Sequence, residues 1–177
     1  PTPMSQNKEE GKIILDATCG SRMMWFNKDH PATLFCDNRE MEKTLIWEGK
    51  NERKGQKRYL EITPDKIVDF RKMDFPDKSF KLVVFDPPHI KHAGKKSWLY
   101  AKYGALGDTW QQDLQKGFSE CWRVLDDYGV LIFKWNEESI NTAEVLKLFS
   151  QKPLFGHPTS KHGKTKWMCF MKITPNP

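Results

Sequence analysis

The chain has 177 residues and a formal net charge of +6, and its length is typical of one domain with a substantial core, so we expect a single domain over residues 1–177. No apolar run is long enough to cross a bilayer, and the polar segment 1–11, expected to be flexible, lacks the apolar stretch of a signal peptide. No two cysteines form a Cys-x-x-Cys pair, which argues against a disulfide framework and a metal site and favours a reducing, cytoplasmic compartment.

The first half of the chain contains four strand-like segments. Residues 13–17 form an apolar run with an acid near its end, and the Ser21 side chain can cap a helix over residues 22–27. Residues 33–37 form a second short strand that ends in an acid. Segments 67–70 and 82–85 are the third and fourth candidates.

The second half continues the alternation of helices and strands. Apolar residues at helical spacing predict a helix over residues 110–125, which a break over 126–129 separates from a fifth strand over 130–135. A short helix is expected over residues 143–149 and a last strand over 166–173. This alternation predicts an α/β Rossmann-like fold, with a mostly parallel, twisted sheet of about seven strands and helices on both faces.

Two segments do not fit the alternation of strands and helices. Residues 47–62 form a long, charged insertion between the second and third strands, for which a hairpin is one interpretation. Residues 90–108 form a basic, aromatic loop that contains glycine. A loop of that length in a compact domain is usually functional or disordered, so we interpret it as a substrate loop.

The positive charge is concentrated in three segments. Residues 50–58, 91–102 and 157–172 each carry a net charge of +4, so the rest of the chain sums to −6. An acidic body with basic segments indicates a polyanionic partner if these segments share one face. The alternative interpretation is that they are ordinary solvated loops.

The most informative motif is Asp86-Pro87-Pro88-His89, which directly follows the apolar run 82–85. Open α/β sheets bind ligands at the carboxyl ends of their strands, where this motif is expected to lie. The two prolines restrict the backbone just beyond the acid. Such a turn can direct the Asp86 carboxylate and the Pro87 carbonyl group at a single amino group.

Several motifs in this order resemble those of class I S-adenosylmethionine-dependent methyltransferases. Residues 14–20 resemble the first motif of that family, and Asp37 resembles the acid that ends its second strand. Asp74-Phe75 resembles the position that contacts adenine. Residues 86–89 resemble the Asp-Pro-Pro-aromatic motif of enzymes that methylate amino groups of nucleic-acid bases. Small methyltransferase-like proteins of phages and prophages are especially similar, including the stretch 117–125.

The resemblance implies S-adenosylmethionine as the cofactor. Gly20 would allow close approach of the backbone, and Asp37 would accept hydrogen bonds from the ribose hydroxyl groups. Asp74 would accept a hydrogen bond from the adenine amino group, and Phe75 would donate its backbone N–H or pack on the ring. Asp16 would orient the first loop or contact the methionine portion. The residues expected at the cofactor are Asp16, Thr18, Gly20, Asp37, Asp74, Phe75 and Asp86.

The resemblance assigns catalysis to Asp86, Pro87 and His89. An aromatic amine is a weak nucleophile because its lone pair is delocalised into the ring. The Asp86 carboxylate and the Pro87 carbonyl group would accept its two N–H bonds and draw the nitrogen towards tetrahedral geometry. His89 would stack on the target base or accept a proton after transfer, and the alternative is a turn histidine without a chemical role.

Substrate contacts are expected mainly in the loop that follows the motif. Lysines for phosphate and aromatic residues for bases are the pattern of proteins that bind single strands. The alternative for Trp98 and Tyr100 is that they anchor the loop to the core. The expected substrate-binding residues are Pro88, His89, Lys95, Lys96, Trp98, Tyr100 and Asn136.

The leading hypothesis is a methyltransferase acting on an exocyclic amino nitrogen of a nucleobase in DNA or RNA, with basic loops or a partner protein supplying target recognition. The second is a methyltransferase acting on a small molecule or a protein side chain. The third is a non-catalytic binding subunit of the same fold. The third is favoured by the first motif, in which Gly20 is the one glycine although the family usually carries two or three.

Overall fold

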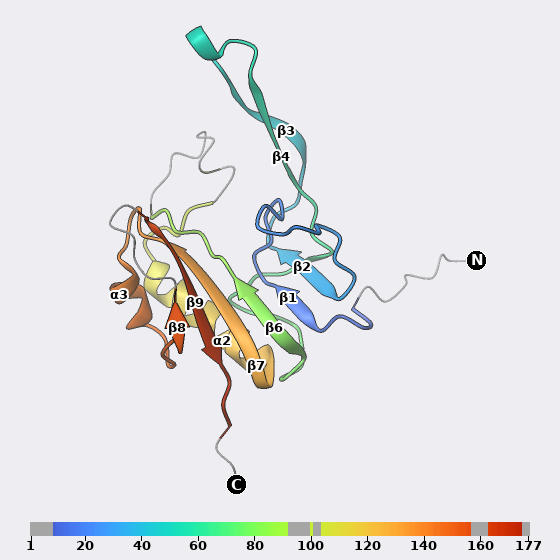
Figure 1. Cartoon of the computed structure of the whole chain (residues 1–177), viewed down its shortest axis with the longest axis vertical. Coiled ribbons are helices and arrows are strands. Elements are labelled where there is room, and N and C mark those ends of the chain that lie inside the picture. The colour runs from blue at the N-terminus through green and yellow to red at the C-terminus, as the bar shows by residue number, and fades with distance from the viewer. Residues whose placement is uncertain (1–8, 92–99, 101–103, 157–162, 175–177) are drawn as a thin grey trace, which may run out of the picture.

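The computed structural model describes residues 9–91, 100, 104–156 and 163–174, and its centre is a seven-stranded sheet in the order β5-β2-β1-β6-β7-β9-β8 (Figure 1). The strands β5, β2, β1, β6 and β7 are parallel to one another, and β9 lies between β7 and β8 and is antiparallel to both. The predicted, mostly parallel α/β sheet is therefore confirmed. Its strands are β1 (Ile14–Asp16), β2 (Thr33–Asp37), β5 (Lys66–Ile67), β6 (Phe80–Phe85), β7 (Leu125–Asn136), β8 (Phe155–Gly156) and β9 (Thr165–Met171).

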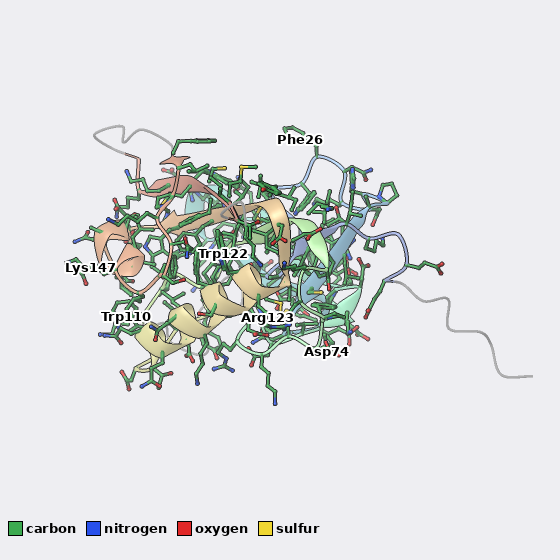
Figure 2. All side chains as sticks on the ribbon, turned by 90° about the horizontal axis from the view of Figure 1, so that it is seen from below. Phe26, Asp74, Trp110, Trp122, Arg123 and Lys147 are labelled. Carbon is green, nitrogen blue, oxygen red and sulfur yellow. The ribbon has the colours of Figure 1, made fainter. Side chains whose placement is uncertain are left out.

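Helices α2 (Trp110–Val124) and α3 (Thr142–Leu146) contribute to one apolar layer on the sheet. The Phe118 ring of α2 stacks on Phe149, just after α3, with ring centroids 4.0 Å apart. Figure 2 shows α2 on one side of the sheet and Phe26 on the other. Within the described residues, α2 and the segment that follows α3 thus pack in the same layer.

The sequence of α2 explains how closely it packs. Leu114 and Phe118 are 0% and 1% exposed, as their helical spacing predicts. Gly117 has no side chain, and a Cβ atom there would lie 2.5 Å from the Phe70 ring and 2.8 Å from the Phe85 ring. The helix can therefore approach the sheet directly beneath these two rings. No helix in the described part of the chain is long and apolar enough to cross a membrane.

The helix predicted over residues 22–27 is wrong, because this segment forms turns. Arg22 has a φ angle of 55°, in the left-handed region that a right-handed helix cannot use. Its guanidinium group donates hydrogen bonds to the carbonyl oxygens of Lys28 (2.6 Å) and Thr63 (2.7 Å) and lies 4.0 Å from the centroid of the Phe35 ring. The tertiary contacts of one arginine thus override the local helix signal.

The other elements differ from the prediction mainly in length. The third strand, predicted over 67–70, is the two-residue β5, because the backbone turns back after Ile67 and forms an isolated bridge between Asp69 and Lys72. The break predicted over 126–129 is the beginning of β7. The short strand β8 was not predicted, since two residues carry no periodic pattern.

The charged insertion 47–62 belongs to a β-hairpin, and this hairpin begins earlier in the chain than predicted. Its strands β3 (Met41–Glu48) and β4 (Lys57–Ile62) pair antiparallel and are joined through the 3-10 turn η1 (Asn51–Arg53). They form a two-stranded sheet of their own that extends as an arm from the main sheet (Figure 1). The basic segment 50–58 therefore lies at the end of this arm.

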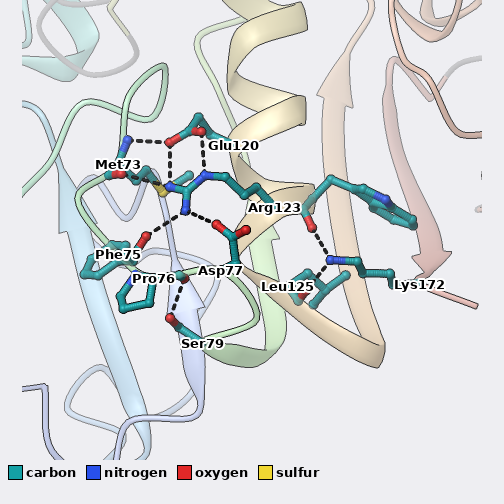
Figure 3. A network of polar contacts seen from close by, with 10 residues as sticks. Met73, Phe75, Pro76, Asp77, Ser79, Glu120, Arg123, Leu125 and Lys172 are labelled. Carbon is teal, nitrogen blue, oxygen red and sulfur yellow. Dashed lines mark hydrogen bonds and ion pairs between the residues drawn. The ribbon is translucent and has the colours of Figure 1, made fainter. Parts of the chain in front are cut away.

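A polar network holds the loop before β6 against the C-terminal end of α2 (Figure 3). Arg123 donates from Nη2 to the Met73 carbonyl oxygen (2.9 Å) and from Nη1 to the Phe75 carbonyl oxygen (2.7 Å). It also pairs with Asp77 and with Glu120, at 2.8 Å each. Glu120 in turn accepts the Met73 N–H at 2.7 Å. The loop is therefore fastened at the amino end of β6.

Candidate active site

The carboxyl ends of β1, β2, β6 and β7 surround one pocket at an edge of the sheet. Loops after neighbouring parallel strands meet at such an edge, so motifs that are distant in the sequence converge there. The pocket joins the loop after β1 to the Asp86 turn after β6. Its lining consists of residues 17–21, 37–39 and 86–89, with Met23, Met24, Phe70 and Lys134.

Asp16 supports the pocket from below without lining it. Its side chain is fully buried, and its two oxygens accept hydrogen bonds from the Thr18 backbone N–H (3.1 Å) and the Trp25 Nε1–H (2.6 Å). Burial raises the pKa of Asp16 to about 7, although both hydrogen bonds act in the opposite direction. Of the two roles expected for this residue, the structure favours orienting the first loop.

Gly20 and Asp37 form the side of the pocket beside β2. Gly20 has a φ angle of 50°, and a Cβ atom there would have no atom within 4 Å, so its backbone is open to a ligand. Its N–H donates to Asp37 Oδ2 at 2.9 Å. Asp37 Oδ1 accepts hydrogen bonds from Arg39, from the backbone N–H at 3.0 Å and from Nε at 3.1 Å. The carboxylate is thus buried and held in a fixed direction at the strand end.

The Asp86 turn is connected to both neighbouring strands. The Asp86 backbone N–H donates a hydrogen bond to the Thr18 hydroxyl oxygen at 2.8 Å, and this bond connects the turn to the loop after β1. Lys134 Nζ, from β7, donates to Asp86 Oδ2 at 2.6 Å. Burial raises the pKa of Asp86, and the Lys134 charge opposes this rise. Pro87 and Pro88 complete this wall of the pocket.

Sequence reasoning expected residues 134–136 to border the site but assigned a contact only to Asn136, so it missed the role of Lys134. The missing signal was the alternation of β7, whose even-numbered residues 130 to 136 are part-exposed while the odd-numbered ones are buried. Asn136 is held elsewhere: its Nδ2 donates to Thr165 Oγ1 at 3.0 Å, and its Oδ1 accepts the Glu138 N–H at 3.0 Å. Asn136 does not line the pocket.

His89 lines the pocket next to the Asp86 carboxylate. Its ring lies edge-on to Trp135, with centroids 6.4 Å apart and an interplanar angle of 83°. Burial lowers the pKa of His89, and the nearby Asp86 charge acts in the opposite direction. A neutral imidazole at pH 7 can both offer an aromatic face and accept a proton.

The structure does not bring Asp74 and Phe75 to the pocket. The Asp74 side chain is 71% exposed and pairs with Lys66 at 3.2 Å. The Phe75 ring packs on Phe80, the first residue of β6, with centroids 5.2 Å apart. This is the amino end of the strand, and the pocket lies at the carboxyl end. Phe70, which follows β5, is the phenylalanine that lines the pocket.

The predicted substrate residues are only partly described. Pro88 and His89 line the pocket, whereas Lys95, Lys96 and Trp98 lie outside the described residues. The Tyr100 carbonyl oxygen accepts the Gly104 N–H at 2.8 Å, and the Tyr100 side chain does not line the pocket. A Cβ atom on Gly104 would lie 3.4 Å from Pro88 Cγ, so the end of the 90–108 loop returns to the pocket rim.

The described residues contain no group of three or more His, Cys, Asp or Glu side chains that could hold a metal ion. The acids at this end of the sheet are instead placed singly, at the ends of neighbouring strands. Asp16 is the last residue of β1, Asp37 is the last residue of β2, and Asp86 directly follows β6. Two of these acids pair with cations of the pocket lining, Asp37 with Arg39 and Asp86 with Lys134.

No protein-family model matches the chain, and no curated protein matches it by sequence. Solved structures do match it. The PH0226 protein of Pyrococcus horikoshii is 16% identical, with a TM-score of 0.52, over 91% of this chain and 81% of that chain. A TehB-like SAM-dependent methyltransferase from Corynebacterium glutamicum is 13% identical, with a TM-score of 0.51, over 92% of this chain and 80% of that chain.

A third solved structure, of a SAM-dependent methyltransferase from Methanosarcina mazei, is 10% identical, with a TM-score of 0.50, over 92% of each chain. At these identities the likeness concerns the fold and not the substrate. The match extends over nearly the whole chain, and the strand order accounts for the pocket at the carboxyl ends. This chain therefore has the fold of S-adenosylmethionine-dependent methyltransferases.

Proposed function

We propose that this protein is an S-adenosylmethionine-dependent methyltransferase that acts on an exocyclic amino nitrogen of a nucleobase in DNA or RNA. The observation that carries the proposal is the hydrogen bond between the Asp86 backbone N–H and the Thr18 hydroxyl oxygen. This bond joins the loop that would hold the cofactor to the turn that would hold the amine. Both are then presented within one pocket.

The residues present fit the cofactor chemically. The open backbone at Gly20 would admit close approach, and the Asp37 carboxylate beside it would accept a hydrogen bond from a ribose hydroxyl group. Phe70 supplies an aromatic wall for adenine. Asp37 pairs with Arg39 and Asp86 with Lys134, so the pocket offers carboxylate acceptors held in fixed directions and not a net negative charge. Bound S-adenosylmethionine would supply an electrophilic methyl group on a sulfonium centre.

The Asp86 turn can activate an amine in this setting. Lys134 occupies Asp86 Oδ2, which leaves Oδ1 and the Pro87 carbonyl oxygen to accept the two N–H bonds of the target amino group. The nitrogen lone pair then turns away from the ring and becomes available for attack. The methylated nitrogen must lose one proton. Asp86 can take it, because burial raises the pKa of this carboxyl group.

Isothermal titration calorimetry with S-adenosylmethionine tests the cofactor assignment. The wild-type protein should bind it, and Asp37→Ala should weaken binding about tenfold or more, since a charged hydrogen-bond acceptor is lost from a buried position. Lys57→Gln, in the hairpin and outside the pocket, is the control that should bind normally. Absence of binding to the wild type would contradict the enzyme assignment and favour a non-catalytic binding subunit.

Transfer of a radiolabelled methyl group tests the substrate class. Total tRNA, ribosomal RNA, duplex DNA and single-stranded DNA are offered in parallel, and nucleoside analysis identifies the modified base. An N-methylated amino base is the expected product. Label in small molecules or in protein, with none in nucleic acid, would favour the second hypothesis over the proposed one.

A further inference from the structure

We propose that the groove between the β3–β4 hairpin and the loop after β1 binds a single nucleic-acid strand next to the catalytic pocket. The groove encloses a volume of about 600 Å³. One wall comes from the hairpin, through residues 43, 46 and 58–61, and the other from the loop, through residues 20–23 and 28–29. The inference rests on the proposed function, because it assigns the surface that would hold the polymer around the target base.

The groove is continuous with the catalytic pocket. Gly20, Ser21 and Met23 line both of them. Met23 is 64% exposed, so the border between the two is an open rim and not a buried partition. A strand lying in the groove can therefore place one of its bases over the rim and into the pocket while its neighbours remain outside.

The charge of the groove suits a phosphate backbone. Lys28, Lys43 and Arg58 line it and form no ion pair with any acid of the described residues. Of its two acids, Asp29 already pairs with Arg22 at 3.3 Å, and Glu61 is the other. Cations without a protein counterion attract the phosphates of a polyanion and release its bound counterions.

Tyr59 supplies the contact that distinguishes a nucleic-acid strand from other polyanions. Its side chain lines the groove and is 53% exposed, with Lys43 Nζ 5.5 Å from its ring centroid. An exposed aromatic ring beside a cation stacks bases and contacts phosphate on single strands. An acidic peptide would use the cations but not the ring. Unstacked bases are available on a single strand and not inside a duplex, so the single strand is the favoured occupant.

The hairpin extends the same surface away from the pocket. Arg58 lies over the Trp47 ring, 5.1 Å from its centroid, on the paired strand. Arg58 itself belongs to the basic segment 50–58 at the end of the arm, which carries a net charge of +4. The arm can thus follow the flanking nucleotides of a strand whose target base occupies the pocket.

Fluorescence anisotropy with a short fluorescein-labelled single strand of mixed sequence tests the groove, with the full-length protein and in the absence of cofactor. The double variant Lys43→Gln/Arg58→Gln should weaken binding about tenfold, and its plot of log K against log salt should be shallower by about 1.4, from two lost phosphate contacts. The matched control Lys116→Gln/Lys147→Gln removes the same charge from exposed positions on α2 and just after α3, outside the hairpin and the groove, and should change binding about twofold or less.

The aromatic contact is tested separately with Tyr59→Ala and Tyr59→Phe. The alanine variant should weaken strand binding about tenfold, whereas the phenylalanine variant should retain it, because stacking needs the ring and not the hydroxyl group. Circular dichroism of the alanine variant checks that the hairpin remains folded. A labelled duplex or a labelled polyglutamate peptide should bind more weakly than the single strand.

Equal losses in the groove and control variants would overturn the proposal, as would equal binding of the duplex or the acidic peptide. The outcome is separable from that of the proposed function. If the groove variants bind S-adenosylmethionine normally and lose strand affinity, the groove is supported even where no methyl transfer is found. If a polymer is methylated with the same KM by the wild type and the groove variants, the function stands and the groove proposal fails.

Discussion

Two proline-containing turns lie at opposite ends of β6 and look alike in sequence. Asp74-Phe75-Pro76 precedes the strand, and Asp86-Pro87-Pro88 follows it. The first is bound to Arg123 through backbone carbonyl groups, and its acid faces solvent. The second holds a mostly buried acid between Thr18 and Lys134 and lines the pocket.

The difference shows that position along a parallel strand decides the role of a turn more than composition does. At the amino end, the partners of the turn are the end of α2 and the Phe80 ring, which are structural. At the carboxyl end, neighbouring strands deliver polar side chains to the same place. Buried acids there can serve a ligand, whereas the Asp74 carboxylate can only form a surface ion pair.

The sharpest test of this comparison exchanges the two acids for alanine. Asp86→Ala should lower kcat about a hundredfold or more, because it removes an acceptor that acts on the reacting amine. Its affinity for S-adenosylmethionine, measured by calorimetry, should remain within about threefold of the wild type. Asp74→Ala should leave both quantities unchanged. Equal losses of kcat and cofactor affinity in Asp86→Ala would mean that the turn is structural at both ends.

A substitution at the turn before β6 should instead lower the free energy of unfolding. Arg123→Met removes charged hydrogen bonds to two backbone carbonyl groups and should cost about 2 kcal/mol in the free energy of unfolding. Urea unfolding measures this change, and the activity per folded molecule should be that of the wild type. Lys78→Met, which removes one exposed ion pair with Asp127, is the control expected to have little effect. A loss of kcat in folded Arg123→Met would contradict the assignment of a structural role to the turn before β6 and a functional role to the turn after it.

Lys134 should set the pH at which the Asp86 turn works. Its positive charge lowers the pKa of Asp86, so Lys134→Met raises that pKa further above the ordinary carboxyl value. The amine needs the ionised carboxylate, so the acidic limb of the kcat profile should move to higher pH, with a loss of roughly tenfold near neutrality. Lys134→Arg keeps the charge and should keep the limb near its wild-type position. An unmoved limb in Lys134→Met would contradict this role.

The smallest expected effect concerns the contact beneath the pocket. A Cβ atom in Gly117→Ala would meet the Phe70 and Phe85 rings, so these rings must shift, at about 1–2 kcal/mol in unfolding free energy. Because Phe70 lines the pocket, cofactor affinity should fall as well, by about threefold. Ser119→Ala, on the exposed side of the same helix, is the matched control. Unchanged affinity in a destabilised Gly117→Ala would place Phe70 outside the cofactor site.

Much of the fold was predictable because its signals are local. Apolar runs predicted β1, β2, β6 and β7, and helical spacing predicted α2. Where a local signal competed with tertiary contacts, the prediction failed. Arg22 lies in turns because it binds Thr63, which is 41 residues away in the sequence. The hairpin was predicted too short, since the first residues of β3 alternate poorly and are mostly exposed.

The sequence alone determined the residue types of the site, because Gly20, Asp37 and the Asp86 turn follow recognisable strands. Only the tertiary structure decided which acids and aromatic residues meet. Phe70 reaches the pocket and Phe75 does not, because the hydrogen bonds of Arg123 hold the Phe75 loop at the amino end of β6. Lys134 reaches Asp86 because β7 pairs with β6, and Lys43 and Arg58 approach the pocket because the hairpin folds beside the loop after β1. These contacts depend on pairing between strands that are distant in the sequence, and no local sequence pattern encodes that pairing.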